Sequence, residues 1–143
     1  MSGNLVQFGE DLHPQLLRLQ VSLNNINGLF ASGSMANEAE LASRLEELRT
    51  SIAATSERAE ELRDMLHAGL ARDVALAPET LSGWVGRRQT AQLHARADLI
   101  EQLAAMAVEL ARLSATEAER TTIAAILARR QAVAVQVQRE DRL

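Results

Sequence analysis

A row of mostly apolar residues at strict four-three spacing constrains the fold of this sequence more than any other feature. Its members are Leu41, Leu45, Leu48, Ile52, Thr55, Ala59, Leu62 and Leu66. This spacing keeps one stripe on one face of an α-helix, and over three heptads it is the pattern of a coiled-coil seam. The row predicts a single helix over residues 38–76, about 55 Å long at about 1.5 Å per residue. A helix of that length must lay its seam against another long helix or against a copy of itself.

A shorter row with the same spacing precedes this helix. Its members are Leu12, Leu16, Leu19, Leu23, Ile26 and Phe30. Proline is tolerated in the first turn of a helix, so Pro14 predicts a helix that begins just before it and spans residues 11–30. Asn37 and Glu40 then resemble a capping box, which predicts the start of the long helix over 38–76.

Two further helices are predicted after Pro78, over residues 79–113 and 117–138. The four-three spacing returns at Leu99, Leu103, Met106, Leu110 and Leu113. Its phase jumps between Leu113 and Ile123, and capping-box motifs lie between them, so we expect a break there. A continuous helix stays open as the alternative, because no glycine or proline lies in this stretch.

The start of the third helix contains Trp84, the chain's only tryptophan, flanked by Gly83 and Gly86. Glycine weakens a helix, so a separate turn or a hinge is expected around these residues. The tryptophan side chain either anchors this stretch on the bundle or binds a partner, since exposed tryptophan is a favoured anchor of interfaces.

These patterns together place the chain in the all-α class. Short connections favour antiparallel neighbours, so we expect an antiparallel four-helix bundle or a long helical hairpin with two shorter flanking helices, with coiled-coil-like packing. At 143 residues, a single helical domain over 1–143 is expected.

Composition excludes several classes of function. The chain has no cysteine, which excludes disulfides and thiolate metal sites. Its net charge is −4, far from the basic surface that a nucleic-acid-binding protein needs. No apolar run approaches the 18 residues of a membrane span, and residues 1–10 lack the pattern of a secretory signal. We therefore expect a cytoplasmic protein with no membrane insertion and no nucleic-acid partner.

The sequence contains no recognisable catalytic or metal-binding constellation. His67 follows Asp64 by three residues, as in half of the Glu-x-x-His motif of di-iron bundles, but His94 has Ala91 at the matching position. Serine or threonine in a glycine elbow with a histidine partner is absent, and so is a glycine-rich phosphate loop. We expect no enzyme activity, no catalytic residues, no cofactor and no metal.

The half of the chain from Leu81 onward carries a periodicity with an arginine before an apolar run. Its residues are Leu81, Trp84, Arg96, Leu99, Ile100 and Leu103, followed after a polar break by Glu117, Arg120, Ile123, Ile126 and Leu127. In this pattern the chain resembles the flagellar and type III export chaperones. The resemblance implies a small cytoplasmic helical protein that holds the helical tail of an export substrate until secretion.

The leading functional hypothesis is a non-enzymatic helical protein–protein interaction module, an adaptor like the export chaperones that binds a partner's amphipathic helix. We expect Trp84, Leu99, Leu103 and Met106 to form the contact surface, with methionine supplying adaptability.

Two alternatives stay open. The regular rows of the first two helices favour a structural homo-oligomer, expected as a dimer, whose helices form a coiled-coil scaffold. A small-molecule sensor would need polar residues converging in the core, and Thr55 is the only obvious candidate on the seam.

Overall fold

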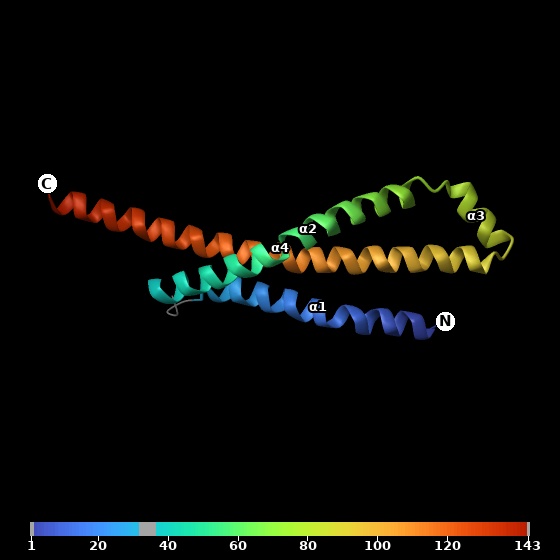
Figure 1. The fold of residues 1–143 in the computed structure, drawn as a ribbon, viewed down its shortest axis with the longest axis horizontal. Helices are drawn as coiled ribbons and strands as arrows, with labels where there is room; N and C mark the ends of the chain where they lie inside the picture. The colour runs from blue at the N-terminus through green and yellow to red at the C-terminus, as the bar shows by residue number, and fades with distance from the viewer. Residues whose placement is uncertain (1, 32–36, 143) are drawn as a thin grey trace. The chain divides into compact units, whose positions relative to one another are not determined.

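The computed structural model describes residues 2–31 and 37–142, and every regular element in them is a helix. The four helices are α1 (Ser2–Gly28), α2 (Glu38–Val74), α3 (Pro78–Gly86) and α4 (Thr90–Asp141). Figure 1 follows the chain through them in order. The predicted all-α class is confirmed.

The long helix was predicted most accurately. It ends two residues earlier than expected, at Val74, and begins at Glu38 as expected. The side chain of Asn37 caps it, since Asn37 Oδ1 accepts a hydrogen bond from the backbone N–H of Glu40 at 2.8 Å. All eight residues of the predicted seam are buried or half-buried in the structure. Thr55 is among them, and its hydroxyl donates to the carbonyl of Ser51 at 3.0 Å within the same helix.

The predicted start of the first helix at residue 11 is wrong. Helix α1 begins at Ser2 and contains Pro14 in its interior. Proline at this position removes the hydrogen bond to the carbonyl of Glu10, four residues earlier. Both Pro14 and Glu10 are exposed, so water can satisfy that carbonyl and the helix continues. Helix α1 ends at Gly28, two residues before the predicted end.

The predicted break at residues 114–116 is also wrong, and the continuous alternative is observed. Helix α4 runs through this stretch, where the hydroxyl of Thr116 donates to the carbonyl of Arg112 at 3.2 Å instead of capping a new helix. The interruption lies at residues 87–89, next to Gly86, where a hinge was the expectation. Arg88 has φ 55, and this left-handed conformation ends α3.

The chain divides into two compact units, and three of the four helices contribute to both. Unit 1 is Met1–Leu16 with Glu57–Ala111, and unit 2 is Leu17–Ser56 with Arg112–Leu143. The expectation of a single domain over 1–143 stays a prediction.

Unit 1 has a core between the second part of α2 and the first part of α4, which lie side by side in Figure 1. Leu62 is fully buried and Leu103 nearly so. Gly69 is buried too, and a Cβ atom built on it would collide with the side chain of Leu103. Gly69 therefore allows the backbone of α2 to approach α4 closely at this point.

Unit 2 has a core of Leu41, Leu48 and Ile123. Four partly buried side chains pack against them: Leu29, Leu45, Ile126 and Leu127. Beside this core lies Glu119, the one charged residue classed as buried in the described part of the chain. Its carboxylate accepts hydrogen bonds from Arg44 of α2 and Asn25 of α1.

The row predicted for the first helix is covered on one side only. Leu12, Leu19 and Ile26 are half-buried, whereas Leu16 and Leu23, together with Phe30, are exposed. Three other residues are half-buried in their place: Gln15, Ser22 and Leu29. The packed face of α1 is therefore rotated away from the centre of its apolar stripe, and part of that stripe faces water.

Candidate functional site

The four residues predicted to form the contact surface all lie in unit 1. Trp84 belongs to α3, and Leu99, Leu103 and Met106 lie on α4. Trp84, Leu99 and Met106 are half-buried, whereas Leu103 is only 5% exposed. The structure therefore leaves three of the four accessible and places the fourth in the core.

A hollow of about 290 Å³ contains Trp84 and Leu99. Its remaining lining comes from α2, from the turn that follows α2, and from α4: Arg72, Asp73, Leu76, Gln92, Ala95 and Arg96. The Nε atom of Arg96 lies 3.3 Å from Oδ1 of Asp73, within ion-pair distance but without a hydrogen bond. This pair connects α2 and α4 along one wall of the hollow.

A second hollow, of about 440 Å³, contains Leu99, Leu103 and Met106. Its other lining residues are Asp64, Met65, Ala68, Gly69, Arg72 and Gln102. Because the two hollows share Leu99 and Arg72, we treat them as one feature, the α2–α4 groove. Leu103 lies beneath the groove and packs against Gly69. Leu103 therefore supports the floor of the groove, and little of its side chain is accessible to a partner.

The α2 side of the groove was missed by sequence reasoning. Met65 is exposed and belongs to none of the predicted sets, although its thioether gives the groove a second adaptable side chain beside Met106. Gly69 also belongs to none of the predicted sets. Whether these residues lie opposite α4 depends on how α2 and α4 align along each other. The spacing of residues within either helix does not predict that alignment.

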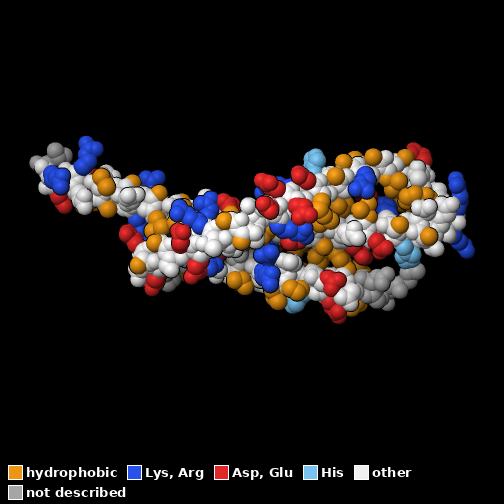
Figure 2. Space-filling view, viewed as in Figure 1, with side chains coloured by type: hydrophobic (Ala, Val, Ile, Leu, Met, Phe, Trp, Pro, Cys, Tyr) orange, Lys and Arg blue, Asp and Glu red, His pale blue; other side chains and the backbone are white. Residues whose placement is uncertain are grey.

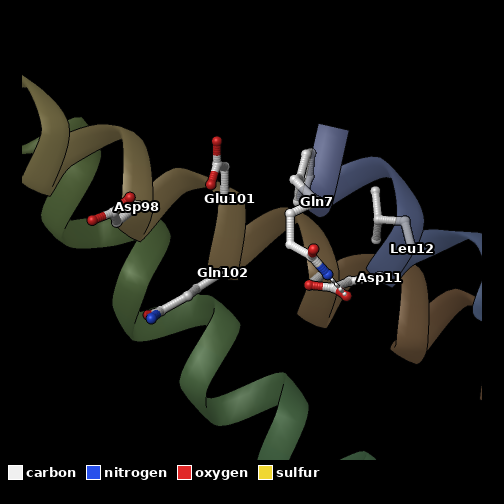
Figure 3. Close-up of a pocket in the computed structure, with 8 residues that line it drawn as sticks. Gln7, Asp11, Leu12, Asp98, Glu101 and Gln102 are labelled. Atoms are coloured by element: carbon white, nitrogen blue, oxygen red, sulfur yellow. Dashed lines mark hydrogen bonds between the residues drawn. The ribbon is translucent and has the colours of Figure 1, made fainter. Parts of the chain in front are cut away.

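A third hollow in unit 1 lies between α1 and α4 and has a different character. It measures about 430 Å³ and includes three carboxylates, of Asp11, Asp98 and Glu101. Figure 3 shows that these carboxylates point in different directions. The amide Nε2 of Gln7 donates to Oδ1 of Asp11 at 2.8 Å. In the described residues, no group of three histidine or acidic side chains could hold a metal ion.

Several large apolar side chains outside the groove are exposed. On α1 they are Leu5, Val6, Leu16, Leu17, Val21 and Leu23. On the last turns of α4 they are Val133, Val135 and Val137. Figure 2 shows apolar side chains at the surface of this end of α4, interspersed with arginine. No helix in the described residues is long and apolar enough to span a membrane.

Comparisons with protein-family models, with curated proteins and with solved structures give no match to this chain.

Proposed function

We propose that this chain is a non-enzymatic helical protein–protein interaction module of the cytoplasm, whose α2–α4 groove binds an amphipathic helix of a partner protein. The observation that carries the proposal is the groove itself. One of its hollows contains Trp84 and the other contains Met106 with Met65 of α2, and Leu99 lines both. Tryptophan and methionine are residues that favour protein interfaces.

The contacts within unit 1 support an antiparallel arrangement of α2 and α4. Arg58 of α2 pairs with Glu109 of α4, and Asp73, further along α2, pairs with Arg96, earlier on α4. Residue numbers therefore rise along one helix while they fall along the other. We propose that this pairing belongs to an antiparallel bundle with coiled-coil-like packing.

The groove is suited to a helix with one apolar face. Its lining combines apolar side chains with Asp64, Arg72 and Gln102, which can bond to polar residues on the flanks of a bound helix. Flexible methionine side chains adapt to different apolar residues, which suits a protein that holds more than one partner. The resemblance to export chaperones supports the same mode of binding, with the helical tail of a substrate as the partner.

Peptide binding measured by calorimetry tests this proposal. We expect amphipathic helical peptides with apolar residues at i, i+3, i+4 and i+7 to bind better than scrambled versions of the same composition. Met106→Glu should weaken binding strongly, because it puts a charge in the groove. Leu70→Glu is the matched control, since Leu70 is exposed on α2 but does not line the groove. Equal binding of native and scrambled peptides, or equal loss in both variants, would contradict the proposal.

A structural homo-oligomer is the second candidate, because the apolar stripe of α1 is only half covered. Leu16 and Leu23 are seven residues apart on one side of α1 and are both exposed. A second copy could cover them and form a scaffold. Light scattering over a wide concentration range tests this candidate: a dimer that persists at the lowest concentration and is lost in Leu16→Ser/Leu23→Ser supports it.

A further inference from the structure

The last turns of α4 in unit 2 contain no buried or half-buried residue. All residues from 131 to 142 are exposed, and Figure 1 shows this end of α4 running past the segments of α1 and α2 that belong to the unit. The stretch contains Val133, Val135 and Val137, and valine is a weaker helix former than leucine or alanine. A helical stretch of about 12 residues is marginally stable in water without tertiary contacts. Covering one of its faces would therefore stabilise it.

One face of this stretch is complementary to itself. At 3.6 residues per turn, six residues fall within an arc of about 120°. In order they are Arg129, Arg130, Val133, Val137, Glu140 and Asp141. The face thus reads as two positive charges, two valines and two negative charges, and its spacing is the same from either end. The other arginines of this segment, Arg139 and Arg142, fall outside the arc.

We propose that a second copy of this chain covers this face, with its own residues 129–141 running in the opposite direction. In that register Arg129 lies beside Glu140 of the second copy along one edge of the face, and Arg130 lies beside its Asp141 along the other edge. Val133 packs on Val137 of the second copy. Each contact occurs twice, as a two-fold symmetric interface requires. A parallel arrangement would instead place like charges opposite each other at both ends, which is unfavourable.

Two observations within unit 2 support this occupant. The Nε2 atom of Gln136 donates to Oε1 of Glu140 at 3.3 Å, and this hydrogen bond orders one carboxylate of the face. An apolar hollow of about 490 Å³ continues the face toward the core, lined by Phe30 and Ile126 together with Arg129 and Arg130. The face carries equal numbers of positive and negative charges, so it offers nothing that would attract an acidic membrane or a nucleic acid.

The proposed contact is short, and this sets the expected affinity. Stable dimers bury about 1,200–2,000 Å² in total, more than a pair of helices about four turns long provides. The dimer should therefore dissociate in the micromolar range. Raising the salt concentration from about 50 mM to about 500 mM should weaken it, because its charge pairs are exposed to solvent.

Sedimentation equilibrium of the full chain tests the valine contact. Val133, Val135 and Val137 are 49%, 52% and 49% exposed, so substituting any of them should disturb the monomer to a similar, small extent. Val137→Arg should raise the dimer dissociation constant about tenfold or more, because it places a charge against valine. Val135 lies on the side of the helix opposite the proposed face, so Val135→Arg should leave the dimer dissociation constant unchanged. A monomer at every concentration, or a dimer dissociation constant that Val137→Arg does not change, would overturn the proposal.

Charge reversal tests the direction of pairing. The variants R129E/R130E and E140R/D141R should each weaken the dimer, because each makes both ends of the face carry the same sign. All four changes combined in one chain restore opposite signs in the antiparallel register, and dimerisation should return. Circular dichroism verifies that each variant remains helical. If the combined variant dimerises no better than either double variant, the antiparallel register is wrong.

Discussion

The carboxylate of Glu119 accepts a hydrogen bond from Nε of Arg44 at 2.8 Å, although Glu119 is 2% exposed and the Arg44 side chain 41%. A second guanidinium nitrogen lies 3.2 Å from the other carboxylate oxygen, and the amide of Asn25 approaches the same oxygen at 3.4 Å. A buried carboxylate needs these partners, because an unpaired charge in a core is strongly destabilising. The network joins one residue from each of the three helices of unit 2.

Removing Arg44 from this network should lower the free energy of unfolding more than removing an exposed arginine does. Arg44→Met leaves Glu119 buried without its cation, and we expect a loss of about 2–3 kcal/mol in the free energy of unfolding. This is less than the full range for buried pairs, because Asn25 still donates. Arg49→Met is the control, since the Arg49–Glu46 pair is exposed, and should cost about 0.5 kcal/mol or less. Urea denaturation measures both, and equal losses would argue against a structural role for Arg44.

The contribution of this arginine should not depend on pH between 7 and 10. The hydrogen bonds that the Arg44 guanidinium donates to Glu119 raise the pKa of Arg44 above its ordinary value. A base with a raised pKa in the folded state stabilises fully below its unfolded pKa and loses that effect only as the pH rises through the folded value. The difference in urea midpoint between wild type and Arg44→Met should therefore be the same at pH 7, 8.5 and 10. A difference that shrinks within this interval would contradict the argument.

Gly69→Ala should destabilise the chain, although alanine is the better helix former. The new methyl group would collide with Leu103, and such overpacking costs about 1–3 kcal/mol. Gly9→Ala, in the interior of α1, meets nothing within 4 Å and should instead stabilise by up to about 1 kcal/mol. Thermal unfolding of both variants shows whether their melting temperatures move in opposite directions. Adding Leu103→Ala to Gly69→Ala should then cost less than the sum of the two single changes.

Arg88→Gly should raise the melting temperature. Arg88 has φ 55, a conformation that costs a residue with a side chain about 1–2 kcal/mol and costs glycine almost nothing. The greater entropy of glycine in the unfolded chain offsets part of this gain. Arg87 has φ −90, so Arg87→Gly brings no such relief and should lower the melting temperature. If Arg88→Gly also lowers it, the left-handed conformation is stabilised by contacts of the arginine side chain.

The interior face of α2 could be predicted because its apolar residues keep one phase for eight positions, and any packed partner would cover that face. The face of α1 could not be predicted to the same precision. Its stripe includes Leu16 and Leu23, yet the structure covers Gln15 and Ser22 instead. The side of the apolar stripe that is covered depends on where the neighbouring helices lie. The spacing of apolar residues within α1 does not determine that.

The candidate groove was predictable on one side for the same reason. Trp84, Leu99 and Met106 share α3 and α4, whereas Met65 and Gly69 come from a helix whose alignment with α4 depends on tertiary contacts. The burial of Glu119 could not be predicted either, because it depends on Arg44, a residue 75 positions away. The break at residues 87–89 depends on the backbone of Arg88, and arginine is not a residue type that indicates a left-handed conformation.

The position of Trp84 makes the groove visible to spectroscopy without any label. It is the only tryptophan of the chain and is half-buried in unit 1, so the intrinsic emission excited near 295 nm comes from this one place. A helix that enters the groove should shift the wavelength and quenching of that emission. The last turns of α4 contain no aromatic side chain, so contact between two copies there adds no chromophore of its own.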